Sequence, residues 1–116
     1  EPNKSEIMNI IGNIDGKNCI IIDDMIDTAG TICNAANAIK DLGAKAVFAA
    51  ATHPILSGPA VERLEASAIE ELVLLNTVPL AEEKKLEKMT FLSVAPLFAE
   101  AMTRVFTNGS ISVLFD

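Results

Sequence analysis

The sequence predicts one α/β domain, or part of one, built on a parallel sheet flanked by helices. Strand-like and helix-like segments alternate along its 116 residues. The strand-like runs are almost continuous in Ile, Val, Leu and Ala, which is typical of strands buried on both faces by helices on either side. The connections are short, as in repeated right-handed strand–helix–strand units.

The first half of the chain predicts two strands, each followed by a helix. A β-rich run at residues 19–22 ends abruptly in acids, and residues 46–52 are again strand-like. Apolar residues at helical spacing follow the first run, and Gly43 ends that helix (Ile32, Ala35, Ala36, Ile39). Ser57-Gly58-Pro59 opens the second helix, which runs to about residue 66, because proline is favoured at the start of a helix.

The second half predicts two further strands and a final helix. The strands are expected at residues 72–75 and 90–94, and the charged stretch 81–88 between them as a solvated helical turn. Apolar residues spaced by four predict a helix over residues 96–107, and residues 111–115 suit a terminal strand. These elements indicate a Rossmann-like sheet, in which ligands bind where the strands end.

Composition and charge exclude several classes of protein. Half of the residues are apolar, so the chain is not a disordered tail. Nine basic against sixteen acidic residues give a net charge of −7, which argues against a nucleic-acid-binding protein or a basic membrane-surface helix. The longest apolar run is too short to span a membrane. Cys19 and Cys33 match no disulfide or metal pattern, which favours reduced thiols and a cytoplasmic location.

Residues 23–31 contain the most informative motif, because they leave a buried strand and enter a helix. Thr28 or Thr31 is expected to cap that helix, whose free amides would form an anion site. Gly30 would let the backbone approach a ligand closely. The candidate site residues are therefore all in this stretch (Asp23, Asp24, Asp27, Thr28, Ala29, Gly30, Thr31).

The three acids of this motif would repel a phosphate unless the ligand also carries hydroxyl groups or a metal. A phosphorylated sugar with two adjacent hydroxyls and a nearby Mg²⁺ would satisfy every group. Side chains of Asp23 and Asp24 cannot face the same side while a strand continues, so the chain is expected to turn there. The alternative is that one Asp is only a helix cap and Thr28 a turn residue.

Residues 21–31 resemble the phosphoribosyl pyrophosphate motif of type I phosphoribosyltransferases. Together with residues 2–3, 11–17, 52–60, 76–79 and 110–115, they resemble the C-terminal domain of the ribose-phosphate pyrophosphokinase family over nearly the whole chain. The chain does not begin with Met, and it is interpreted as a C-terminal fragment, because the family's ATP-binding elements and its Lys- and Arg-rich catalytic loop precede this region.

The resemblance implies a transferase of nucleotide biosynthesis. Family members transfer the diphosphoryl group of Mg-ATP to ribose 5-phosphate, giving phosphoribosyl pyrophosphate and AMP. Residues 27–31 would bind the 5-phosphate, while Asp23 and Asp24 would bind the ribose hydroxyls directly or through Mg²⁺. No catalytic residue is expected in this fragment, which alone is expected to be inactive. Other interpretations are a non-catalytic, synthetase-like regulatory subunit or a phosphoribosyltransferase that uses phosphoribosyl pyrophosphate.

The resemblance also implies a regulatory site for phosphate or ADP between the subunits of a hexamer. Its residues here would lie at the end of the chain (Ser110, Ile111, Ser112, Phe115). The alternative is an edge strand whose polar residues face water. His53, Asn76 and Thr77 leave strands at the expected binding edge, and each is interpreted either as a ligand contact or as a structural residue.

Overall fold

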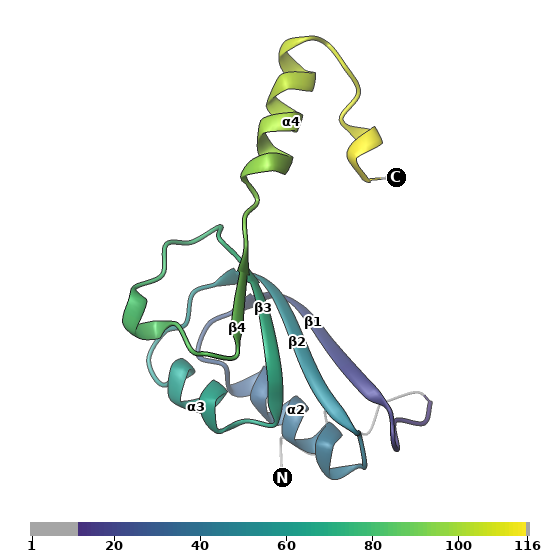
Figure 1. The fold of residues 1–116 in the computed structure, drawn as a ribbon, viewed down its shortest axis with the longest axis vertical. Helices are drawn as coiled ribbons and strands as arrows, with labels where there is room; N and C mark the ends of the chain where they lie inside the picture. The colour runs from purple at the N-terminus through teal and green to yellow at the C-terminus, as the bar shows by residue number, and fades with distance from the viewer. Residues whose placement is uncertain (1–11, 116) are drawn as a thin grey trace.

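Four parallel strands form one sheet in the order β1-β2-β3-β4 in a computed structural model that describes residues 12–115. The strands are β1 (Asn18–Ile26), β2 (Ala46–Pro54), β3 (Ile69–Leu75) and β4 (Met89–Leu92). Helix α2 (Gly30–Asp41) connects β1 to β2, and α3 (Ala60–Ala66) connects β2 to β3 (Figure 1). The predicted α/β class with a parallel sheet is confirmed.

The last helix, α4 (Ala95–Phe106), extends from the end of β4 away from the sheet (Figure 1). None of its residues is buried. The terminal strand expected at residues 111–115 is wrong, since Ser112–Phe115 form a short 3₁₀ helix, η2. The reason is that α4 carries the chain away from the four strands of residues 12–115 (Figure 1). The other 3₁₀ helix, η1 (Glu82–Lys84), lies within the stretch predicted as a helical turn. In the described part of the chain, none of the helices has the length and apolar character needed to cross a bilayer.

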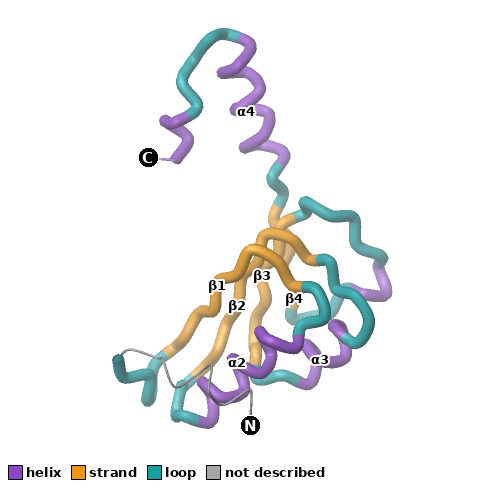
Figure 2. Tube along the Cα trace, turned by 180° about the vertical axis from the view of Figure 1, so that it is seen from behind, coloured by secondary structure: helices purple, strands orange, loops and turns teal. Residues whose placement is uncertain are grey.

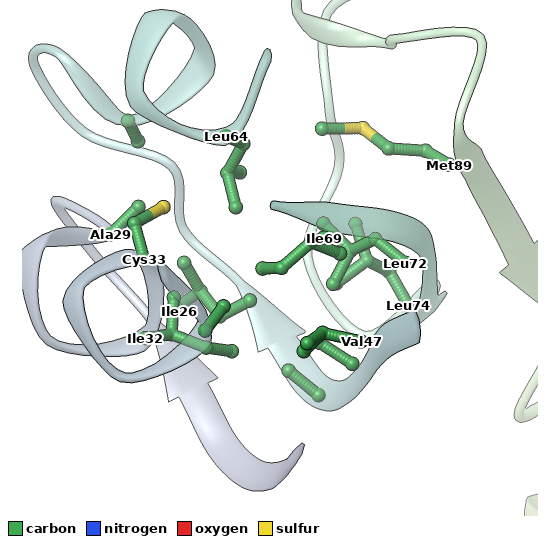
Figure 3. Packing of buried hydrophobic residues seen from close by; sticks show 14 of the residues in the cluster. Ile26, Ala29, Ile32, Cys33, Val47, Leu64, Ile69, Leu72, Leu74 and Met89 are labelled. Atoms are coloured by element: carbon green, nitrogen blue, oxygen red, sulfur yellow. The ribbon is translucent and has the colours of Figure 1, made fainter. Parts of the chain in front are cut away.

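The hydrophobic core lies between one face of the sheet and helices α2 and α3 (Figure 3). Alternate residues of β2 and β3 point into it, as the period of a strand requires. Leu72 and Leu74 of β3 and Leu64 of α3 are completely buried there. These side chains fix the position of α3 beneath the sheet, and with it the loop that precedes the helix.

The opposite face of the sheet is open among the described residues. Ile20, Ile22 and Leu92 are 67%, 80% and 51% exposed. Figure 2, seen from behind, shows that α2 and α3 both lie on one face of the sheet, the face opposite to these exposed residues. The expected burial of the strands on both faces is therefore not found within residues 12–115. Apolar composition alone did not distinguish a covered face from an open one.

Strand β1 is longer than the sequence predicts. It continues through the acids to Ile26, because Met25 and Ile26 pair with His53 and Pro54 of β2. The turn expected at Asp23 and Asp24 is therefore wrong, and the chain leaves the sheet only after Ile26. The sheet thus carries the acidic residues to its carboxyl edge.

Both cysteines are free, and they differ in their surroundings. Cys33 of α2 is 5% exposed, whereas Cys19 of β1 is half-buried. Burial raises the pKa of the Cys33 thiol, although a hydrogen bond with Ser67 and the positive charges of Lys88 and Arg63 oppose the shift. The neutral thiol is therefore the stable form of Cys33.

Alkylation of Cys33 by iodoacetamide is expected to be at least tenfold slower in the folded chain than in urea, since both burial and a raised pKa reduce the accessible thiolate. The rate should rise at a higher pH than for an unfolded thiol. A Cys19→Ser variant isolates the signal, and mass spectrometry measures it. Equal rates in the folded and unfolded chain would contradict the buried position of Cys33.

Candidate functional site

The segment between β1 and α2 is held from one side by the segment between β2 and α3. Backbone amides of Ile55 and Leu56 donate to the carbonyl of Ile26 at 3.0 and 3.1 Å, and the amide of Ser57 donates to that of Asp27 at 2.8 Å. The Arg63 Nη1 donates to the next carbonyl, that of Thr28, at 3.1 Å. Three consecutive carbonyls are thus tied to residues 55–63.

This arrangement determines where the amides of the same peptide groups point. In a planar trans peptide the N–H and the preceding carbonyl lie on opposite sides. The amides of Asp27, Thr28 and Ala29 therefore face away from residues 55–63. The next amides, beginning with Gly30, precede the first hydrogen bond of α2, which runs from the amide of Cys33 to the carbonyl of Ala29 at 3.1 Å. The segment consequently offers a row of backbone donors at the positive end of a helix.

Ala29 occupies the N-cap of α2 with φ 68° and ψ 9°, and no side chain caps the helix. The expected capping role of Thr28 or Thr31 is therefore wrong. Leu56, whose amide binds the Ile26 carbonyl, also has a positive φ, 54°. Non-glycine residues adopt this conformation rarely, and such strain gathers at functional sites. Ala29 and Leu56 are two such residues on neighbouring segments. The backbone is therefore strained on both sides of this contact.

The β1–α2 segment lines a concavity of about 240 Å³ at the carboxyl edge of the sheet. Six of the seven predicted site residues line it, together with Met25, Ile26 and Ile32 (Asp23, Asp27, Thr28, Ala29, Gly30, Thr31). Asp24 does not, because successive residues of the continuing strand face opposite sides. The Oδ1 of Asp23 accepts a hydrogen bond from the Asp24 amide at 2.8 Å. The structure therefore brings together amides, hydroxyls and carboxylates, as a phosphorylated polyol would require.

Gly30 faces a different neighbour from the one expected. A Cβ added there would lie 3.1 Å from Arg63 Nη1, and the backbone of Gly30 does not need a positive φ. The missing side chain thus makes room for the guanidinium behind the segment. Sequence analysis missed this role of Arg63, because a contact across 35 residues leaves no trace in local spacing.

His53 and Thr77 form a hydrogen-bonded pair between the ends of β2 and β3. The Thr77 hydroxyl donates to the Thr52 carbonyl at 2.9 Å, so it can only accept from His53 Nδ1, at 2.7 Å. This contact assigns the proton of neutral His53 to Nδ1 and leaves Nε2 as an acceptor. Asn76 binds the backbone amide of Val94 at 2.8 Å. Thr77 and Asn76 therefore have structural partners, as one of the two interpretations of these residues expects.

The predicted regulatory residues lie beyond α4. The hydroxyls of Ser110 and Ser112 are 2.8 Å apart, and the carbonyl of Ser110 accepts from Arg104 Nη1 at 3.1 Å. Ile111 and Phe115 are 38% and 76% exposed. These side chains are exposed, and the 3₁₀ helix η2 lies beside α4, above the sheet (Figure 1).

No group of three or more His, Cys, Asp or Glu side chains that could hold a metal ion occurs in residues 12–115. A magnesium ion often takes only one or two protein carboxylates and completes its shell with water and substrate phosphate. Asp23, which lines the concavity and has one carboxylate oxygen outside the bond to Asp24, fits that kind of site.

Comparison with known proteins identifies the family. The model of the family described as "Phosphoribosyl synthetase-associated domain" matches residues 1–116. The chain belongs to this family. Its relatives include ribose-phosphate pyrophosphokinases from Bacillus caldolyticus, 59% identical over the whole chain, and from Clostridium perfringens, 62% identical over 97% of it.

A solved structure shares the fold. The crystal structure of phosphoribosylpyrophosphate synthetase from Mycobacterium smegmatis matches 85% of the chain with a TM-score of 0.82 and 47% identity. The chain spans 37% and 35% of the length of the Bacillus and Clostridium relatives and 33% of the solved chain. The similarity therefore concerns about a third of these longer proteins.

Proposed function

We propose that this chain carries the ribose 5-phosphate site of a ribose-phosphate pyrophosphokinase. The enzyme would transfer the diphosphoryl group of Mg-ATP to ribose 5-phosphate and release phosphoribosyl pyrophosphate and AMP. One observation supports the site above all others: three consecutive carbonyls of the β1–α2 segment are bound to residues 55–63, so that the amides of the same peptides face away from those residues. The names of the relatives support the choice of substrate.

The phosphate would bind at the start of α2. Amides from Thr28 to Thr31 and the two threonine hydroxyls would donate to its oxygens, and the helix dipole would favour its charge. Asp23 would accept hydrogen bonds from the ribose hydroxyls within the concavity, and Asp24, on the other side of the strand, would do so from outside it. Asp27 follows β1 at the start of the turn. Such binding positions the anomeric hydroxyl for attack, which is how positioning contributes to phosphoryl transfer.

Mg²⁺ would accompany the substrates, held in part by Asp23 and Asp24, and would neutralise charge on the transferring phosphoryl groups. ATP and the cationic groups that face it would come from the rest of the protein. In this proposal the chain is the C-terminal domain of a cytoplasmic homo-oligomer, a hexamer by resemblance. The accessible segment from Ser110 to Phe115 would then contribute to a site for phosphate or ADP at a subunit contact.

The 116-residue chain is expected to bind ribose 5-phosphate but to produce no AMP from Mg-ATP. Calorimetry with ribose 5-phosphate, ribose and inorganic phosphate measures the first part, and ribose should bind far more weakly because it lacks the phosphate. A coupled assay measures the second part. Lack of binding by ribose 5-phosphate would contradict the proposed site, and robust AMP release would contradict the view that the ATP machinery lies elsewhere.

The same assay on the longer protein that contains this chain separates the remaining interpretations. AMP released together with phosphoribosyl pyrophosphate supports the enzyme. Binding of ribose 5-phosphate with no turnover would indicate a non-catalytic, synthetase-like subunit. Release of pyrophosphate from phosphoribosyl pyrophosphate in the presence of a nucleobase would indicate a phosphoribosyltransferase.

A further inference from the structure

We infer that Arg63 is a positioning residue for phosphate binding, one that acts on the ligand through a peptide group of the β1–α2 segment. This inference rests on the proposed function of that segment. Arg63 lies on α3, and its guanidinium reaches the Thr28 carbonyl from behind at 3.1 Å. Among the described residues, no other Lys or Arg side chain donates a hydrogen bond to residues 23–31.

The peptide group between Thr28 and Ala29 connects the arginine to the ligand side. Its carbonyl accepts from Arg63, so its N–H, on the Ala29 nitrogen, points the opposite way. A hydrogen bond from a charged donor is stronger than one from a neutral donor. It fixes the plane of this peptide and polarises it, which makes the Ala29 amide a better donor to an anion.

The conformation of Ala29 shows why such a tie is useful. Its left-handed φ of 68° is unfavourable for alanine, and no side chain caps the helix there. The Arg63 contact holds the carbonyl of the peptide that leads into Ala29, and it leaves the free amides of α2 without a side-chain cap. The backbone donors of residues 55–57 fix the two preceding carbonyls, and Arg63 extends this series to the residue at which the helix begins.

Gly30 is the second observation that concerns the same guanidinium. A methyl group at this position would lie 3.1 Å from Arg63 Nη1, which is closer than almost all Cβ contacts allow. The guanidinium is the flexible partner and would have to move. Gly30 and Arg63 are thus expected to act as a pair, in which the small residue leaves the space that the arginine fills.

The arginine acts from behind the segment, where it does not need to touch the phosphate. A direct contact would place a positive charge beside three acids and the ligand at once. Arg63 instead donates a hydrogen bond to the Thr28 carbonyl. Loss of its side chain should therefore weaken phosphate binding, while contacts to the ribose hydroxyls remain. Binding of ribose 5-phosphate should therefore fall, and the affinity for Mg-ATP should not.

The test compares Arg63→Ala with Arg63→Lys and a control in the longer protein. Lys45→Ala serves as the control, since it removes the same charge from an exposed position next to the opposite end of β2. Arg63→Ala is expected to raise KM for ribose 5-phosphate roughly tenfold, which corresponds to the loss of about one charge-assisted hydrogen bond. KM for Mg-ATP should stay unchanged. Arg63→Lys should recover part of the loss, because an ammonium retains the charge but not the planar geometry.

NMR of the ligand-free protein tests whether Arg63 acts on the Ala29 amide. The ¹⁵N and ¹H shifts of the Ala29 amide should move in Arg63→Ala and in Gly30→Ala, and the double variant should add little to either. They should stay unchanged in Lys45→Ala. A moved Ala29 amide with a raised KM for ribose 5-phosphate alone supports the inference.

The outcomes separate this inference from the proposed function. If the wild-type protein binds ribose 5-phosphate and Arg63→Ala binds it equally well, the inference is wrong and the proposed function stands. An equal loss of affinity for ribose 5-phosphate and Mg-ATP in Arg63→Ala would show a general structural defect. That result would also overturn the inference. If the wild-type protein does not bind ribose 5-phosphate, both the proposed function and the inference fail.

Discussion

Replacement of Asp24 by alanine, in the longer protein, is expected to weaken ribose 5-phosphate binding roughly ten- to hundredfold and to reduce the response to Mg²⁺. A hydrogen bond to a charged group contributes about 1.5–3 kcal/mol, which corresponds to that range of affinity. β1 carries Asp23 and Asp24 on opposite sides, so Asp24 would reach a ribose hydroxyl or Mg²⁺ outside the concavity that Asp23 lines. Titration with and without Mg²⁺ measures both effects.

The matched variant is Thr28→Val, which keeps the volume of the side chain and removes its hydroxyl. It should weaken binding by the same amount at every Mg²⁺ concentration, since Thr28 would touch phosphate. Asp24→Ala should instead show a loss that depends on the metal. Identical profiles for the two variants would contradict the separate roles of carboxylates and threonine. Unchanged binding in Asp24→Ala would leave Asp23, which lines the concavity, as the sole carboxylate of the site.

The second large effect is expected for Leu72→Ala, which should lower the free energy of unfolding by about 3 kcal/mol. Leu72 is completely buried and packs in the hydrophobic core with Ile69 and Leu74 (Figure 3). Removal of its branched end leaves a cavity that rigid strands cannot close. For a domain of this size the melting temperature should fall by about 10 °C. Thermal and urea unfolding of the 116-residue chain measure the change.

Leu92→Ala is the control, because it makes the same chemical change on the open face of the same sheet. Leu92 is 51% exposed, so its loss should lower the free energy of unfolding by less than about 1 kcal/mol. Equal effects of the two variants would show that the second face is covered in solution. The comparison therefore tests the one-sided core directly.

The sequence predicted the fold well where one local pattern determines an element. The helix after the first strand ends at Asp41 as expected, and the last helix begins at Ala95, one residue before its predicted start. The prediction from sequence failed where pairing between distant segments determines the end of a strand. β1 continues through Asp23 and Asp24 because β2 pairs beyond them, although acids usually end a strand. The terminal segment follows α4, which leads away from the four described strands, and no local property of residues 111–115 reveals that.

The sequence indicated which residues surround the concavity, but not which contacts orient their backbone. The motif at residues 23–31 identified the side chains around the concavity, since strand exit and helix entry are local features. What orients their backbone comes from residues 55–63, in particular a left-handed Leu56 and the distant Arg63. Leucine has no preference for that conformation, so nothing in its sequence neighbourhood indicated it.

The order of the strands has a consequence for how the protein is made. Because β1, β2, β3 and β4 pair in the order in which they are translated, each new strand meets an edge that has already left the ribosome. The β1–α2 segment, however, is held by residues 55–63, which are synthesised later. During synthesis the segment therefore remains without its final shape until α3 has emerged, and the proposed phosphate site would form only at that point.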